Sequence, residues 1–271
     1  MIPFPDPCNP SFQRAEFRVP SDAATFKITA CSADHIGDRQ DQQDRVAILT
    51  SRYWPGSLLA LVADGMGGRT GGRLASDQVI ATARNLFDDR PDAEMDGRGL
   101  LGAIVAEAHT VIRLTAVAAE KEPHSTLVAL LVQGRRADWV HVGDSRLLHF
   151  LDGALLHRTI DHSYGSTLNA SGELIEGGPE RRRFRSVLFS ALGARSELRI
   201  DYGEADGLRA GDSFVLASDG LWTYVKEPEM ASLLQDLPAR DAAQRMVDLA
   251  RARARGKGDN LSLVVIKMEP A

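Results

Sequence analysis

Hydrophobic and polar residues alternate along several short stretches of the chain. In FKITACSA, residues 26–33, apolar and polar residues alternate over most of the stretch, which is typical of a β-strand with one buried face. Short apolar runs bounded by glycine, proline or polar residues indicate further strands. Trp54, Pro55 and Gly56 are expected in the turn between two of them. The strands predicted in this way are residues 26–33, 46–51, 57–64, 126–134, 137–145, 146–153, 154–159, 198–205, 212–219 and 259–268.

Four longer segments carry apolar residues at helical spacing, and they fall into two groups along the chain. The helices are predicted at residues 71–87, 100–121, 227–237 and 239–255. Strands and helices therefore come in blocks rather than in βαβ alternation, which favours an α+β fold with antiparallel sheets and helices on the outside.

The domain organisation predicted from the sequence is simple. Residues 1–22 are rich in proline and polar residues and are expected to form an irregular arm, and residues 23–271 a single domain. Residues 161–186 are polar and glycine-rich, and they indicate a surface flap. Four arginines in this segment could recruit an acidic or phosphorylated substrate, although a solvated face is the more usual meaning: Arg181, Arg182, Arg183 and Arg185.

Composition narrows the class of protein. With 271 residues, 44% hydrophobic and 25% charged, the chain is typical of a soluble globular protein. A net charge of -5 argues against nucleic-acid binding, and two cysteines are too few for a disulfide framework. The sequence shows neither a signal-peptide pattern nor an uninterrupted apolar stretch of about 18 residues, so we expect a cytoplasmic monomer without a membrane span.

Aspartates recur at the ends of the predicted strands. A single Asp-Gly after an apolar run usually marks a turn, and Asp152-Gly153 fits a hairpin. If the strands share one core, however, the other aspartates can converge, and their repulsion would require a cation. Because no histidine or cysteine accompanies them, oxygen-preferring Mg²⁺ or Mn²⁺ is expected. These aspartates are Asp64, Asp144, Asp219 and Asp259.

Several blocks together resemble a known family. VADGMGGRTGG, VHVGDSR, ASDGLW and GDNLSLVVI follow one another in the order found in PP2C-type (PPM) metal-dependent protein serine/threonine phosphatases, in their bacterial stand-alone form. IGDRQDQQDR, residues 36–45, resembles the family's N-terminal Arg-x-x-Asn-Glu-Asp block, and RTIDHS and RSVLFSALG resemble the blocks around its flap. The resemblance runs from about Phe26 to Met268 and implies a four-layer α-β-β-α sandwich.

The resemblance also implies a metal centre and a reaction. Two Mn²⁺ or Mg²⁺ ions would be bridged by Asp64, with the carbonyl of Gly65, while Asp44 holds metal-bound water that attacks phosphoserine or phosphothreonine directly. Arg39 would bind the substrate phosphate, because a guanidinium fork matches phosphate geometry. The substrates would be phosphoproteins of a cognate kinase. The remaining implied ligands are Asp219 and Asp259 for the pair of ions, and Asp144 with Asp219 for a third, weaker site.

Some positions depart from the family pattern. Gln43 replaces a glutamate and removes one negative charge, and His124-Ser125-Thr126 replaces a Gly-Thr-Thr-like segment. Met66 stands where animal members often carry a histidine proposed as the general acid, so metal-bound water is the default proton donor. Gln43 and the altered His124 segment are the only support for the alternative, a pseudophosphatase that binds phosphoproteins. An enzyme of a partner-switching pathway ranks lower. His162 is expected to contact the flap rather than to take part in catalysis.

Overall fold

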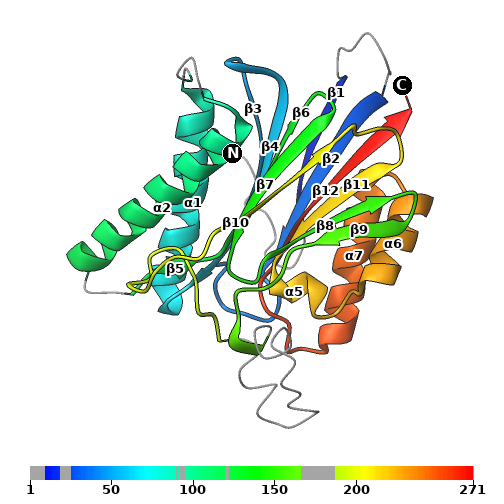
Figure 1. Cartoon of the computed structure of the whole chain (residues 1–271). Coiled ribbons are helices and arrows are strands. Elements are labelled where there is room, and N and C mark those ends of the chain that lie inside the picture. The colour runs from blue at the N-terminus through cyan, green and yellow to red at the C-terminus, as the bar shows by residue number, and fades with distance from the viewer. Residues whose placement is uncertain are drawn as a thin grey trace, which may run out of the picture.

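A computed structural model describes residues 10–18, 26–89, 91, 95–119, 122–165 and 187–270. Two β-sheets lie face to face, and helices cover both outer faces, so the molecule has four layers (Figure 1). Every strand pairing in these described ranges is antiparallel. The predicted α+β class and the α-β-β-α sandwich are therefore confirmed.

The first sheet, called here the β2 sheet, is built mainly from the C-terminal half of the chain. Its strands, in spatial order, are β1 (Ser11–Arg18), β2 (Phe26–His35), β12 (Leu261–Pro270), β11 (Asp212–Ala217), β8 (Arg146–Leu151) and β9 (Ala154–Arg158). Three helices cover its outer face (Figure 1): α5 (Asp219–Trp222), α6 (Glu227–Asp236) and α7 (Ala239–Ala254).

The second sheet, called the β4 sheet, is covered by the two long helices α1 (Gly68–Asp88) and α2 (Gly97–Ala119) (Figure 1). A short strand, β5 (His124–Ser125), pairs with the end of β4. The strands of the main ladder, in spatial order, are β10 (Asp201–Asp206), β7 (Arg136–Val142), β6 (Leu127–Gln133), β4 (Trp54–Met66) and β3 (Asp44–Ser51).

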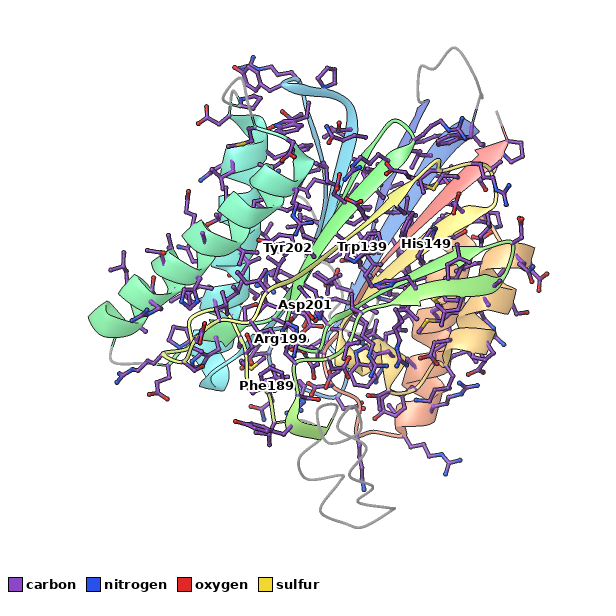
Figure 2. The ribbon with its side chains drawn as sticks, viewed as in Figure 1. Trp139, His149, Phe189, Arg199, Asp201 and Tyr202 are labelled. Carbon is purple, nitrogen blue, oxygen red and sulfur yellow. The ribbon has the colours of Figure 1, made fainter. Side chains whose placement is uncertain are left out.

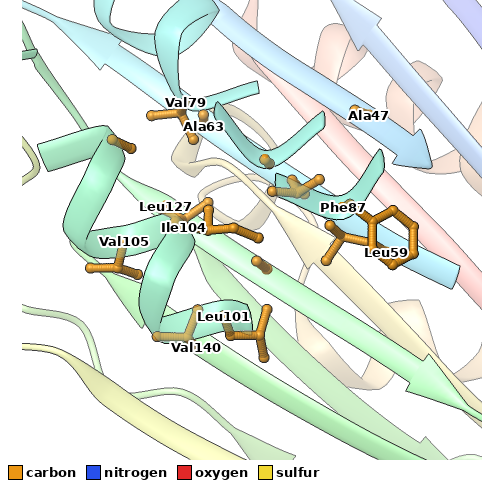
Figure 3. Close-up of a cluster of buried hydrophobic side chains, with 14 of the residues drawn as sticks. Ala47, Leu59, Ala63, Val79, Phe87, Leu101, Ile104, Val105, Leu127 and Val140 are labelled. Carbon is orange, nitrogen blue, oxygen red and sulfur yellow. The ribbon is translucent and has the colours of Figure 1, made fainter. Parts of the chain in front are cut away.

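Strand β4 shows why its apolar run is unbroken. Leu58, Ala60 and Val62 point into the core between the two sheets, whereas Leu59 and Leu61 point toward α1 and α2. Figure 3 shows Leu59 packed beside Phe87 of α1 in this outer cluster. Both faces of the strand are buried, so neither face tolerates polar residues.

Two predictions about local structure are wrong. Residues 11–18 of the expected irregular arm form β1, which pairs with β2 along its whole length. Trp54, Pro55 and Gly56 belong to β4, because Ser51 pairs with Trp54 and leaves the turn to Arg52 and Tyr53. By length and composition alone, a 20-residue stretch of α2, Gly97–Ala116, could cross a membrane.

The apolar character of α2 has a structural explanation. Leu101, Ile104 and Val105 are fully buried between the helix and the β4 sheet (Figure 3). The flap was predicted at residues 161–186, and most of it, with its four arginines, lies outside the described residues. The predicted Asp152-Gly153 hairpin is confirmed, because both residues have positive φ and join β8 to β9.

Candidate active site

The aspartates that the sequence singled out meet at one end of the sandwich. Asp44 begins β3 and lies directly opposite Asp64 near the end of β4. Asp144 follows β7, and Asp219 begins α5, immediately after β11. Asp259 lies in the loop that leads into β12. Strands of both sheets therefore deliver carboxylates to the same place, near α5 and β5 (Figure 1).

Burial and mutual repulsion dominate the electrostatics of this acidic cluster. Burial, followed by the charges of neighbouring aspartates, raises the pKa of Asp144 to about 8 and that of Asp219 to about 6. Asp44 has its pKa raised to about 7, mainly by burial, although Ser218 Oγ donates a hydrogen bond of 2.7 Å to Asp44 Oδ2. The pKa of Asp64 is raised well above its usual value by burial and by the charge of Asp44.

The raised pKa values are the expected consequence of placing several carboxylates together in a buried site without a counter-charge. Two like charges about 4 Å apart cost roughly 4 kcal/mol at an effective dielectric constant of 20. A divalent cation would offset this repulsion, and a set of carboxylate oxygens suits a hard ion such as Mg²⁺ or Mn²⁺. The residues present therefore fit the metal ions that the resemblance implies.

Arg39 lies at the rim of the cluster. Its Nη2 is 2.5 Å from Asp259 Oδ2, and the side chains of Arg39 and Asp259 remain 59% and 42% exposed. The hydrogen bond to Asp259 raises the pKa of Arg39, and the charges of Asp219 and Asp64 add to this effect. Arg39 therefore combines proximity to the acidic cluster with access to solvent.

A groove of about 550 Å³ gives access to the cluster. Arg39, Asp64 and Asp259 all face it, so a phosphate group entering the groove could contact all three. Its lining residues are Asp38, Arg39, Gln40, Asp41, Gln43, Asp64, Gly65, Met66, Gly67, Gly68, Asp259 and Asn260.

The backbone around Asp64 is fixed on both sides. The Asp64 N–H donates to Thr126 Oγ1 (2.9 Å), and the Thr126 N–H donates to the Asp64 carbonyl (2.9 Å). Ser125 Oγ also donates to that carbonyl, at 3.2 Å. A methyl group on Gly65 would overlap the carbonyl oxygen of Gly72 in α1, so this position requires glycine. The unusual His124-Ser125-Thr126 segment thus retains the hydroxyl groups that hold Asp64.

Gln43 and Asn260 organise the loop that carries Arg39. Asn260 Oδ1 accepts from the Gln43 N–H (2.7 Å), and Asn260 Nδ2 donates to the carbonyls of Ile36 and Asp41. Gln43 Nε2 donates to the Gly68 carbonyl at 3.0 Å. The glutamine therefore makes a contact with α1 that a glutamate, which carries no N–H in its side chain, could not make.

Sequence reasoning missed several supporting residues. Asp161 accepts two hydrogen bonds of 2.7 Å from Arg146, whose guanidinium stacks 3.6 Å from the centre of the Trp222 ring. Trp222 Nε1 in turn donates to the Asp144 carbonyl at 3.1 Å. Asp161 lies in the RTIDHS block and Arg146 in the GDSR block. The sequence blocks were therefore recognised, but neither residue was assigned a role in the site. Asp38, which bonds Arg251 and the Gly258 N–H, lies beside Arg39 in the groove.

Comparisons with known proteins agree with this geometry. The family model described as "Protein phosphatase 2C" matches residues 31–252. Serine/threonine protein phosphatase PstP of Mycobacterium tuberculosis is 35% identical over 219 residues, which is 78% of this chain and 40% of PstP. The chain thus spans well under half the length of that relative.

Solved structures extend the comparison to the fold. The crystal structure of Mycobacterium tuberculosis PstP/Ppp has a TM-score of 0.75 at 31% identity, covering 89% of this chain and 99% of that one. The PstP catalytic domain in complex with two manganese ions has a TM-score of 0.69 at 27% identity, covering 96% and 98%. The matched family model spans most of the chain and includes four of the five converging aspartates, all but Asp259. This chain belongs to the protein phosphatase 2C family.

Proposed function

We propose that this chain is a cytoplasmic, metal-dependent phosphatase that hydrolyses phosphoserine and phosphothreonine in proteins, opposing a serine/threonine kinase. The observation that carries the proposal is the convergence of Asp44, Asp64, Asp219 and Asp259, of which Asp64 and Asp259 line one open groove together with Arg39. A protein that only binds phosphoproteins would gain nothing from a buried cluster of carboxylates that repel one another.

The carboxylates are proposed to hold a pair of Mn²⁺ or Mg²⁺ ions. Asp64, the Gly65 carbonyl, Asp219 and Asp259 would hold the two ions. Asp44 is hydrogen-bonded to Ser218 Oγ, which in turn accepts from the Ser262 N–H, so its orientation is fixed from the β2 sheet. When bound, such ions lower the pKa of water to supply a nucleophile at neutral pH and neutralise charge on the transferring phosphoryl group.

Arg39 is proposed to bind the phosphate dianion of the substrate. Its guanidinium is exposed and now pairs with Asp259, so it can exchange this partner for phosphate oxygens without moving far. A charge-assisted, two-pronged hydrogen bond to phosphate is about twice as strong as a neutral one. Arg39 thus orients the phosphorus over the acidic cluster.

The residues that line the groove restrict which groups can donate a proton to the leaving oxygen. The residues that line it include no histidine and no cysteine, and Met66 stands near Asp64 without a titratable group. We therefore assign proton delivery to water, and we expect no covalent phosphoenzyme, because attack by water needs no side-chain nucleophile.

Phosphate release from a phosphothreonine peptide tests the proposal. The purified chain should release phosphate with Mn²⁺ or Mg²⁺, lose this activity in EDTA, and regain it when metal is restored. Asp219→Asn should be inactive, whereas Asp248→Asn on the exposed face of α7 should match the wild type. Peptide binding without release under any metal condition would instead support the phosphoprotein-binding module.

A further inference from the structure

His162 makes a reciprocal contact with the residue before Asp144. The His162 N–H donates to the Gly143 carbonyl at 2.8 Å, and the Gly143 N–H donates to His162 Nδ1 at 3.2 Å. His162 therefore binds both the carbonyl and the N–H of Gly143, the first through its backbone and the second through its ring. Gly143 itself has φ +104°, and a methyl group there would overlap Thr126, so the contact depends on glycine.

Aromatic rings and an acidic residue fix the imidazole of His162. The ring is fully buried, its centre lies 4.4 Å from that of His141 and 5.7 Å from that of Phe189. His162 Nε2 is 3.3 Å from Asp201 Oδ2, and Arg199 holds the same carboxylate. Figure 2 shows Phe189, Arg199 and Asp201 next to one another in this region. The ring therefore has little freedom to turn.

The hydrogen bonds assign the protonation of this ring. Since Nδ1 accepts the Gly143 N–H, the single proton of the neutral ring is on Nε2, facing Asp201. Burial lowers the pKa of His162 to about 4, so the ring is neutral near pH 7. Nitrogen and oxygen atoms of His141, His162 and Asp201 lie within 4.8 Å of one another. Because an ion at this point would have to displace the Nε2 proton, we assign this group a supporting role for the ring rather than a metal-binding one.

The segment 143–145 is held from the other side by residues that also hold Asp64. Ser145 Oγ is 2.7 Å from Thr126 Oγ1, the same hydroxyl that accepts from the Asp64 N–H. Asp144, between Gly143 and Ser145, therefore has its backbone fixed at both neighbours. The chain of contacts links the acidic cluster to His162 through Thr126 and Ser145.

His162 also belongs to the base of the predicted flap. The Phe189 N–H donates to the His162 carbonyl at 3.0 Å, and the Tyr164 N–H donates to the Val187 carbonyl at 3.0 Å. These bonds join the two ends of the segment between residues 165 and 187. One residue thus contacts both the flap base and the support of Asp144.

We propose that His162 is a positioning residue that, through Gly143, fixes the position of the Asp144 carboxylate. It thereby determines the affinity of the protein for its most weakly bound metal ion. It also connects this metal site to the base of the flap. The proposal rests on the proposed function, and this ion is the third, weaker one that the family resemblance assigns to Asp144 and Asp219. Loss of a residue that orients a ligand typically weakens metal binding by about 10- to 100-fold.

Two substitutions separate the roles of the ring. In His162→Asn, the amide oxygen replaces Nδ1 as the acceptor for the Gly143 N–H. In His162→Gln, the amide reaches toward Asp201 and the acceptor for Gly143 is lost. We expect His162→Gln to lower the affinity for the most weakly bound Mn²⁺ ion about 10- to 100-fold. The affinity in His162→Asn should stay within about threefold of that of the wild type. Electron paramagnetic resonance of the free Mn²⁺ measures both affinities. His157→Gln, on the exposed strand β9, is the control.

The outcomes are distinct. Equal weakening in Asn and Gln variants, in step with their melting temperatures, would reveal a merely structural role and overturn the inference. Unchanged Mn²⁺ affinity in His162→Gln, with normal wild-type binding, would overturn this inference alone, whereas a wild type that binds no Mn²⁺ would overturn the proposed function as well. If His162→Gln does not fold, hydrogen exchange of the Gly143 amide in the wild type provides the test. We expect slow exchange, because this amide donates to His162 Nδ1. Rapid exchange in the folded protein would refute the contact between Gly143 and His162.

Discussion

Asp44 is buried among other carboxylates, and this placement makes the stability of the metal-free protein depend on pH. Burial, together with the charges of Asp219 and Asp259, raises its pKa from 3.8 to about 7, although the Ser218 hydrogen bond opposes this shift. The folded state therefore binds the proton more tightly than the unfolded state. The resulting stabilisation is fully present below about pH 4 and is lost as the pH rises through 7.

The size of the effect follows from these two pKa values. Between pH 5.5 and pH 8, Asp44 should lower the free energy of unfolding by about 2 kcal/mol, or roughly 4–8 °C in melting temperature for a chain of this size. Buried histidines act in the opposite direction: burial lowers the pKa of His141 and His162, so their stabilisation is present at high pH and is lost as the pH falls below about 6.5. The difference between wild type and Asp44→Asn isolates the carboxyl.

Thermal unfolding in EDTA measures this difference. Asp44→Asn should lose about 2 kcal/mol less than the wild type between pH 5.5 and pH 8, while Asp248→Asn, exposed on α7, should follow the wild type. Adding Mn²⁺ at pH 8 should stabilise the wild type, because an ion that binds only the folded state shifts the equilibrium toward it. The same pH dependence in Asp44→Asn and wild type would refute the account of the buried cluster.

Three further substitutions test individual contacts. Arg39→Ala should raise KM for a phosphopeptide by about 10- to 100-fold with little change in Mn²⁺ affinity, as steady-state kinetics and metal titration would report; an unchanged KM would exclude the phosphate-binding role. Gln43→Glu should add a negative charge near the groove and lower the Mn²⁺ concentration for half-maximal activity by several-fold, although the hydrogen bond to the Gly68 carbonyl is lost. A higher Mn²⁺ concentration for half-maximal activity would contradict this expectation. Gly65→Ala should destabilise the fold by about 1–3 kcal/mol in urea unfolding, because the methyl group meets Gly72; wild-type stability would show that the contact can relax.

Much of the fold was predictable because buried strands and helices leave strong patterns. The unbroken apolar run of β4 indicated a strand buried on both faces, and Asp152-Gly153 marked the hairpin. Strand β1 was missed because it lies at the edge of its sheet, follows a proline-rich segment and carries exposed Gln13, Arg14 and Glu16. Helix α5 has only four residues, too few for a periodic signal.

The sequence predicted the aspartates of the candidate site but not the residues whose hydrogen bonds hold these aspartates in place. Asp64 and Asp219 stand out because each follows an apolar strand, and their side chains do meet in space. The direct pairing of Asp44 with Asp64 depends on strand register, which alternation alone does not give. The contacts of Thr126 and His162 join segments far apart in sequence, and a serine, threonine or histidine carries no signal of such a partner.

Hydrolysis of p-nitrophenyl phosphate by the wild type and by Asp64→Asn tests the central claim most directly. Each protein is assayed with Mn²⁺, with Mg²⁺ and with EDTA, after circular dichroism has shown that both are folded. We predict metal-dependent turnover by the wild type and a loss of at least about 100-fold in Asp64→Asn, because Asp64 lies at the centre of the acidic cluster. Wild-type turnover by Asp64→Asn, or the absence of turnover by the folded wild type with either metal, would contradict the assignment of this cluster as the metal centre of a phosphatase.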